Sequence, residues 1–238
     1  MWNVNVGTLF PDLFPGPLGV SCIGKALGSL WHLNVRDLRN YALDKHKTVD
    51  DTPFGGGPGM VMKADVLDNW LSEVYNGGRI IYMSPRGKLF KQQHINSFLE
   101  KDLYILCGRY EGVDCRFLKH WNVEEVSIGD YVLCGGEIAA MTLVESCVRL
   151  IPNVLKNAES VAHDSLSNGL LEHDQYTKPY SWVPKNCEIE YNTPCVLKSG
   201  NHRRISEWKK SNSEKVTQEA RSDLWIEYVR KKEKNADS

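Results

Sequence analysis

Three glycine-containing loops carry the residues best suited to binding a small molecule. They are Ser84–Gly87 (SPRG), Cys107–Gly112 (CGRYEG) and Ile128–Glu137 (IGDYVLCGGE), and each follows a short apolar run. Ligands of open α/β sheets bind beyond the carboxyl ends of the strands. Glycine allows close backbone approach, and Tyr110 and Tyr131 add flat aromatic faces, so the three loops could enclose an adenine and a ribose. Each loop taken singly is equally compatible with an ordinary strand-to-helix turn.

A fourth glycine cluster, Asp51–Met60 (DTPFGGGPGM), is too rich in Gly and Pro for a helix or a central strand. A phosphate-binding P-loop needs a second glycine five residues after Gly55, and Met60 stands there instead. A dinucleotide-binding loop that starts at Gly55 and Gly57 needs a third glycine at the same position. Both nucleotide-binding patterns are therefore excluded for this segment.

The elements that would position these loops alternate along the first 150 residues. Short runs rich in aliphatic, β-branched or aromatic residues predict β-strands over Val4–Phe10, Arg79–Met83, Asp102–Cys107 and Glu124–Ile128. Helical periodicity predicts helices over Lys63–Glu73, Lys88–Glu100 and Glu137–Leu150, and Pro152 ends the last one. This alternation predicts an α/β fold with a largely parallel sheet covered on both faces. General rules of chain topology favour an unknotted version of it.

The chain changes character after Pro152. Residues 156–175 are polar and lack periodicity, which predicts a linker between a domain over 1–155 and a small helical domain over 176–238. The last forty or so residues read as helices, whose candidate core residues are Trp208, Leu224, Trp225, Ile226, Tyr228 and Val229.

Composition is that of an ordinary globular protein, with 42% apolar and 25% charged residues among 238. No apolar run approaches the roughly 20 residues that span a bilayer, and the first residues lack the features of a signal peptide. The seven cysteines never occur as C-x-x-C, which argues against a zinc site or a disulfide framework. We therefore expect a cytoplasmic protein without a membrane partner.

Charge is divided unevenly along the chain. Residues 176–238 contain 13 Lys and Arg against 9 Asp and Glu, whereas residues 1–175 contain 16 against 21. The two parts carry +4 and −5, which add to the overall −1. A mildly basic C-terminal part permits contact with a polyanion without requiring it, since a solvated helical face would look the same.

Motifs in order along the chain resemble those of the bacterial tRNA (guanine-N1)-methyltransferases. They are TLFP, VDDTPFGGGPGM, IYMSPRG, CGRYEGVD, SIGDYVLCGGEIAAM, RLIPNVL and DSLSNGLLEHDQYTKP, and they extend from about residue 4 to about residue 210. This family belongs to the SPOUT class, whose fold contains a deep trefoil knot. The resemblance thus implies a knot where general topology rules would not, and a homodimer whose subunits together complete each active site.

The family binds S-adenosyl-L-methionine in the loops that form the knot. Carried onto this chain, the resemblance implies a set of cofactor-binding residues in the three glycine-containing loops. They are Tyr82, Met83, Ser84, Pro85, Gly108, Tyr110, Glu111, Ile128, Gly129, Tyr131, Leu133, Gly135 and Gly136. No residue is assigned to a metal, although the family is reported to favour Mg²⁺, which Glu111 could bind if it does not neutralise the sulfonium.

The implied reaction transfers a methyl group to N1 of guanosine 37, next to the anticodon of a tRNA. N1 carries a proton, so the transfer calls for a base near N1 and a cation near O6. Asp164 resembles the general base of the family and Arg149 resembles its arginine. Read alone, Asp164 is typical of a helix N-cap, and Arg149 of a cation at a helix C-terminus.

The resemblance also suggests residues that contact the tRNA. Arg203 and Arg204, in the basic C-terminal part, would bind phosphates of the anticodon arm. Asp50, just before DTPFGGGPGM, could face the RNA or the cofactor of the partner subunit. Glu172 stands where the family usually has Asp, so its role as a substrate contact is less firmly implied.

Other activities fit the sequence less well. A SPOUT enzyme that methylates ribose 2′-hydroxyls needs no base for N1, and a non-enzymatic RNA-binding relative needs neither Asp164 nor Arg149. A nicotinamide-dependent oxidoreductase would need a dinucleotide fingerprint, which the sequence lacks.

Overall fold

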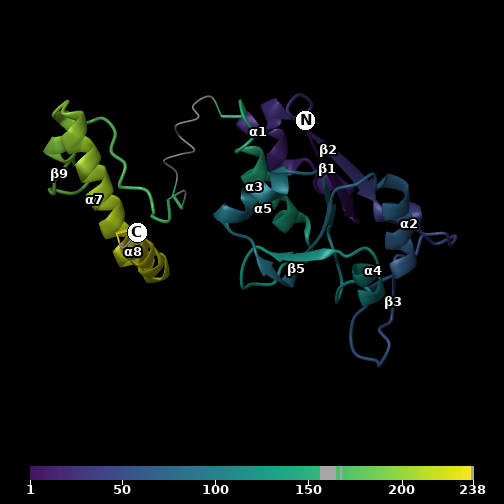
Figure 1. The fold of residues 1–238 in the computed structure, drawn as a ribbon. Helices are drawn as coiled ribbons and strands as arrows, with labels where there is room; N and C mark the ends of the chain where they lie inside the picture. Colours follow the sequence, from purple (N-terminus) through teal and green to yellow (C-terminus); the bar gives the residue numbers. More distant parts are fainter. Residues whose placement is uncertain (156–164, 167, 237–238) are drawn as a thin grey trace. The chain divides into compact units, whose positions relative to one another are not determined.

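The computed structural model describes residues 1–155, 165–166 and 168–236, and the chain forms two units, Met1–Ala158 and Glu159–Ser238 (Figure 1). The first unit is built on a five-stranded sheet in the order β2-β1-β6-β5-β7, and every neighbouring pair is parallel. Its strands are β1 (Trp2–Thr8), β2 (Trp31–Asp37), β5 (Arg79–Leu89), β6 (Leu103–Leu106) and β7 (Glu124–Ser127). The predicted α/β class with a parallel sheet is confirmed.

Helices cover both faces of this sheet, as the alternation of elements predicts. On one face lie α1 (Ser21–Ala26), α3 (Ile95–Leu99) and α5 (Glu137–Val148), and on the other α2 (Ala64–Val74) and α4 (Cys115–His120). A strand between two layers must be apolar on both sides. The four residues of β6 accordingly are all buried.

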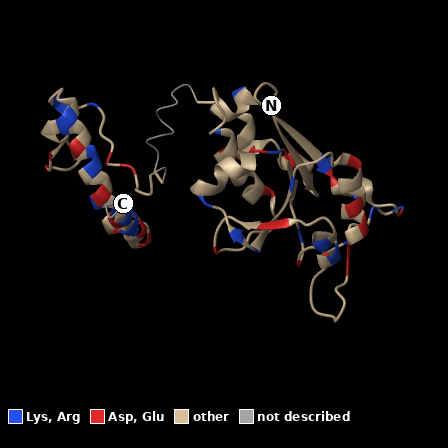
Figure 2. Cartoon of the chain, in the orientation of Figure 1, with Lys and Arg blue, Asp and Glu red and all other residues tan. Residues whose placement is uncertain are grey.

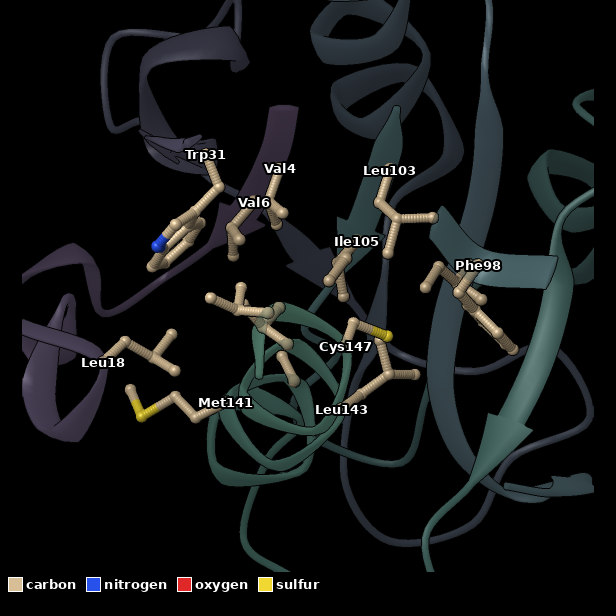
Figure 3. Packing of buried hydrophobic residues seen from close by; sticks show 14 of the residues in the cluster. Val4, Val6, Leu18, Trp31, Phe98, Leu103, Ile105, Met141, Leu143 and Cys147 are labelled. Atoms are coloured by element: carbon tan, nitrogen blue, oxygen red, sulfur yellow. The ribbon is translucent and has the colours of Figure 1, made fainter. Parts of the chain in front are cut away.

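The larger core cluster fills the space between the sheet and α5 (Figure 3). Leu103 and Ile105 of β6 extend into it from the sheet, and Leu143 and Cys147 enter it from α5. Leu143 and Cys147 are four residues apart, so they lie on the same side of the helix. This packing fixes the helix that begins directly after the third glycine-containing loop.

Several elements differ from the sequence-based expectation, most of them by one or two residues at an end. The first strand covers Trp2–Thr8 instead of Val4–Phe10, and β2 was not predicted at all. The helix expected over Lys88–Glu100 is wrong for most of its length, because β5 continues to Leu89 and α3 contains only Ile95–Leu99. A renewed pairing of β5 with β7 extends the strand through Lys88 and Leu89.

Short elements complete the first unit. The strands β3 (Asp50–Asp51) and β4 (Val61–Met62) form an antiparallel pair, and the glycine-rich segment lies between them. Short 3-10 helices occur at Pro11–Leu13, Gly16–Gly19, Leu38–Tyr41 and Gln92–His94.

The described residues of the second unit form the helices α7 (His202–Ala220) and α8 (Ser222–Ala236), as the C-terminal periodicity predicts. A small antiparallel pair, β8 (Ser181–Trp182) and β9 (Tyr191–Asn192), and a 3-10 helix at Cys195–Lys198 precede them. The end of the predicted linker is bound to α7, because Leu171 N donates to Thr217 Oγ1 at 2.9 Å.

Burial in the second unit is slight. Among its described residues, only Leu170 and Thr217 are buried. The predicted C-terminal core is therefore wrong in part: Trp208, Leu224, Trp225, Tyr228 and Val229 are half-buried, and Ile226 is 49% exposed. Within the described residues of either unit, no helix combines the length and apolarity that crossing a membrane requires.

Candidate active site

One cavity of about 240 Å³ lies at the carboxyl ends of β5, β6 and β7. Its lining consists of residues 82–85, 108–112, 126–129, 131–136 and Ala139. All thirteen residues that the resemblance assigns to the cofactor belong to this lining. They meet because β5 lies between β6 and β7 and all three strands run in the same direction. The structure thus brings the three glycine-containing loops together.

The first wall of the cavity is an interruption within β5. Residues 84–87 leave the ladder, because Met83 and Lys88 lie opposite the same residue of β7. The side chain of Ser84 is buried, and its Oγ donates a hydrogen bond of 2.9 Å to Oε2 of Glu125. Residues 84–87, which were expected to form a loop after the strand, therefore form a bulge within β5. The hydrogen bond to Glu125 of β7 holds this bulge.

The second wall is the loop after β6, which begins at Gly108. A Cβ on Gly108 would lie 2.5 Å from the ring of Tyr82, so only glycine lets the loop pass so close to this ring. Burial of the ring, followed by the charge of Glu125, raises the pKa of the Tyr82 hydroxyl. Tyr82 thus stays uncharged at neutral pH and presents an aromatic surface to the cavity.

The third wall is the loop after β7, and it is joined to the second by an ion pair between half-buried Arg109 and buried Glu137. Arg109 lies 2.9 Å from Oε2 of Glu137, and its Nε donates to Oε1 at 3.2 Å. Thr8 Oγ1 donates to the same Oε1 at 2.7 Å. A further guanidinium nitrogen of Arg109 donates to the carbonyl of Cys134 at 3.2 Å, and the Phe10 ring lies 4.2 Å from its Cζ. This network connects the loop after β6 with the loop after β7 and the first turn of α5.

The glycine-rich segment packs against the second wall. Glu111 N donates to the carbonyl of Met60 at 2.9 Å, and a Cβ on Gly59 would lie 2.4 Å from the Glu111 side chain. Partial burial, then the charge and hydrogen bond of Asp50, raises the pKa of Tyr110. Asp50 therefore lies beside a residue of the cavity, although it does not line the cavity itself.

The remaining predicted residues lie elsewhere. Arg149 is half-buried and forms the C-cap of α5, and Asp164 lies outside the described residues. Glu172, Arg203 and Arg204 belong to the second unit, where all three are exposed. The structure therefore groups the predicted cofactor residues, and of the predicted RNA contacts it places Asp50 beside them.

Sequence reasoning passed over two charged residues of this site, Arg109 and Glu137. Arg109 lies within the CGRYEG motif and lines the cavity, and Glu137 follows directly after the last glycine of the third loop and is 1% exposed. Their pairing across 28 positions depends on the order of strands in the sheet, which no local pattern reveals. The described parts of both units contain no group of three or more His, Cys, Asp or Glu suited to a metal ion.

Comparison with known proteins places these features in a family. The family described as tRNA (Guanine-1)-methyltransferase TrmD matches residues 2–227. A tRNA (guanine-N(1)-)-methyltransferase of Ruegeria sp. (strain TM1040) is 49% identical over 240 residues, which cover 98% of this chain and 96% of the relative. Relatives with the same description are 51% identical in Roseobacter denitrificans, covering 94% and 93% of the two chains, and 48% identical in Pelagibacter ubique, covering 96% and 99%.

Proposed function

The chain belongs to the tRNA (guanine-1)-methyltransferase family, and we propose that it transfers a methyl group from S-adenosyl-L-methionine to N1 of guanosine 37 in tRNA. The observation that carries this proposal is the single cavity lined by all thirteen residues that match the cofactor loops of the family. The relatives with 48–51% identity over nearly the whole chain support the same activity.

The cavity suits the cofactor chemically. Apolar side chains such as Ile128 and Leu133 line it, and Gly108, Gly135 and Gly136 add no side chain that would keep an adenosine from the backbone. S-adenosyl-L-methionine supplies a methyl group on a sulfonium, which is already a good leaving group. The protein's task at this centre is therefore to hold the donor in line with its acceptor.

The acceptor requires catalysis by the protein, because N1 of guanine carries a proton that must be removed. Oxygen O6 gains negative charge as this proton leaves. We assign Asp164 as the base that takes the N1 proton and Arg149 as the cation that stabilises O6. These assignments rest on the match of both residues to the family motifs. An aspartate has an ordinary pKa of about 3.9, so in water it is ionised but a weak base.

The position of Arg149 supports a homodimer with shared active sites. Helix α5 begins beside the cavity and Arg149 follows its last residue, twelve helical residues later. At 1.5 Å per residue this is a distance of roughly 18 Å. Arg149 therefore does not reach the cavity from its own end of α5, and a second subunit would have to supply it.

Exposed apolar side chains near the cavity are consistent with that second subunit. Val132 is 85% exposed in the loop after β7, and Ile138 is 57% exposed in the first turn of α5. Val20, 62% exposed, follows the 3-10 helix that packs on α5. Exposed large apolar side chains of this kind are available for contact with a second subunit.

We also assign the SPOUT knot to the first unit of the chain. Its support is the unusually close passage of backbones around the cavity. A Cβ on Gly87 would lie 2.3 Å from the backbone of Glu125 and Val126. Similarly, Gly136 N donates to the carbonyl of Gly108 at 3.1 Å. A knot at the cofactor site requires backbones to pass each other this closely.

The second unit is assigned to the anticodon arm. Helix α7 carries Arg203 and Arg204 in its first turn, and its exposed faces are rich in charged side chains (Figure 2). With a net charge of +4 over residues 176–238, binding should depend on salt without being exceptionally tight. Asp50 and Glu172 are further proposed contacts to the RNA. A guanine turned out of its stack would be read by side chains in this arrangement.

Two subsidiary assignments complete the proposal. A cytoplasmic location agrees with the seven cysteines, all of which are free thiols. Magnesium is less well supported by the residues themselves. Among the described residues that line the cavity, Glu111 is the one carboxylate, and Mg²⁺ usually takes one or two carboxylates together with phosphates. An all-protein site is therefore not formed, and no step of the reaction depends on the ion here.

The decisive experiment locates the methyl group by mass spectrometry on tRNA transcripts that carry either guanosine or adenosine at position 37. Methylation at N1 of guanosine 37 alone is expected. A methyl group on a ribose would favour a 2′-O-methyltransferase, and binding without methylation would favour a non-enzymatic relative. The Asp164→Ala variant should lose nearly all turnover and bind S-adenosyl-L-methionine within a few-fold of the wild type; normal turnover would remove Asp164 as the base.

A further inference from the structure

Glu137 is a buried carboxylate that the proposed reaction does not use. It is 1% exposed, at the first residue of α5, and its two oxygens accept hydrogen bonds from Thr8 and from two nitrogens of Arg109. The N-terminal end of a helix also favours negative charge. An ionised carboxylate buried this deeply is stable only with such partners, so Glu137 and Arg109 form a fully paired unit.

Arg109 is held in place by the same contacts. Its guanidinium binds Glu137 and the carbonyl of Cys134, and the Phe10 ring covers it at 4.2 Å. A Cβ on Gly135 would lie 2.2 Å from Nε of Arg109, so a larger residue there would displace the side chain. The guanidinium therefore has a fixed position at the wall of the cavity.

The charge of the cavity follows from these positions. Arg109 and Glu111 are the only ionisable Lys, Arg, Asp or Glu side chains among the described residues that line it. Together they contribute zero, and Glu137 behind the wall brings the sum over these three side chains to −1. Without Glu137, a cationic ligand would enter a neutral site and face an uncompensated guanidinium.

We infer that Glu137 is a specificity-determining residue, which neutralises Arg109 so that the cavity prefers a cationic sulfonium over a neutral thioether. The inference rests on the proposed use of S-adenosyl-L-methionine. The methyl donor carries a positive sulfur, whereas the product S-adenosyl-L-homocysteine has a neutral one. A local charge of −1 thus favours the donor and weakens retention of the product, while Arg109 keeps its second role of joining the two loops.

The test compares the affinities of donor and product by isothermal titration calorimetry in the wild type and in Glu137→Gln. Glutamine keeps the shape of the side chain and removes its charge. We expect donor affinity to fall about tenfold, the effect of one unit charge roughly 10 Å away at intermediate dielectric, and product affinity to change less than twofold. An equal loss for both ligands, or an unchanged ratio, would overturn the inference.

Three variants separate charge from structure. Thr8→Val removes a hydrogen bond of the same network without changing charge, and the ratio of affinities should stay as in the wild type. Arg109→Gln combined with Glu137→Gln restores the local −1 and should restore the ratio. If Glu137→Gln alone does not fold, Arg109→Gln alone still tests the inference. Its ratio of donor affinity to product affinity should be at least that of the wild type, and a lower ratio contradicts the inference. Failure of the wild type to bind either ligand would instead contradict the proposed function.

Discussion

The two units of this protein differ in how many residues they bury and in how much charge they expose. The first buries one apolar cluster on each face of a parallel sheet, and its cavity is enclosed by loops that are hydrogen-bonded to one another. The second displays charge along α7 and, among its described residues, buries only Leu170 and Thr217. Thr217 bridges its own helix and residue 171 through its hydroxyl.

This difference indicates how much each unit depends on a packed core for its function and its stability. A shape-specific cavity needs walls whose positions are fixed by a packed core. A surface that binds a polyanion needs mainly charge, since phosphate contacts tolerate some adjustment. A unit of about eighty residues that buries so little has a small hydrophobic contribution to its stability. We therefore expect the first unit to dominate the stability of the chain.

The largest effect is expected from a matched pair of side-chain truncations, one in each unit. Leu143 of α5 is fully buried, whereas Ile226 of α8 is 49% exposed. Leu143→Ala should lower the free energy of unfolding by about 3 kcal/mol, and Ile226→Ala should change it by less than about 0.5 kcal/mol. Urea unfolding followed by circular dichroism measures both. Equal losses would mean that α8 is covered by a partner, and the contrast between the units would no longer hold.

A second test uses the buried thiol of Cys147, in the core under α5. Burial raises the pKa of Cys147 to about 12, and the charge of Arg79 opposes the rise only in part. An unfolded cysteine has a pKa of about 8.5. The unfolded chain therefore releases this proton first, and stability that is fully present below about pH 8.5 is lost as the pH rises toward 12.

The expected loss is about 1.4 kcal/mol per pH unit within that window, measured as the free energy of unfolding between pH 8 and pH 10.5. Cys147→Ala should remove this contribution to the slope. Val148→Ala is the control, because it also creates a cavity in α5 but leaves the thiol in place. If the free energy of unfolding of Cys147→Ala falls with pH as steeply as that of the wild type, the Cys147 thiol does not cause the loss of stability.

Much of the first unit could be predicted because its signals are local. Each strand that ends at the cavity is a short apolar run, and parallel strands bring their carboxyl ends to one edge, so the predicted cofactor residues meet in the cavity. The strand β2 escaped prediction because it lies at the edge of the sheet. Its sequence, WHLNVRD, mixes polar and apolar residues, and only Trp31 is buried.

Other features depend on contacts that are distant in sequence. The return of β5 to its ladder at Lys88 follows from pairing with β7, and a helical pattern over Lys88–Glu100 cannot reveal it. The Arg109–Glu137 pair likewise needs the fold to bring two loops together. In the second unit, periodicity correctly marks helices, yet it does not show whether anything covers their apolar side, as exposed Ile226 illustrates.

The smallest expected effect concerns the charge displayed by the second unit. Arg203 is exposed and pairs with the exposed Glu207 in an i,i+4 contact, and such pairs contribute little to stability. Replacing Arg203 and Arg204 with Gln should therefore leave the fold and the affinity for S-adenosyl-L-methionine unchanged. The dissociation constant for tRNA should rise about tenfold, and the slope of log affinity against log salt should become shallower by about two, one for each lost phosphate contact.

The control removes two exposed lysines of the first unit, Lys25→Gln with Lys101→Gln, and so makes the same change in net charge. Fluorescence anisotropy with a labelled anticodon stem-loop, between 50 and 200 mM salt, would compare the two double variants. A general electrostatic attraction predicts equal weakening in both. Weakening confined to Arg203→Gln with Arg204→Gln would mean that the phosphates lie against α7, and that the poorly buried unit is the one that holds the RNA.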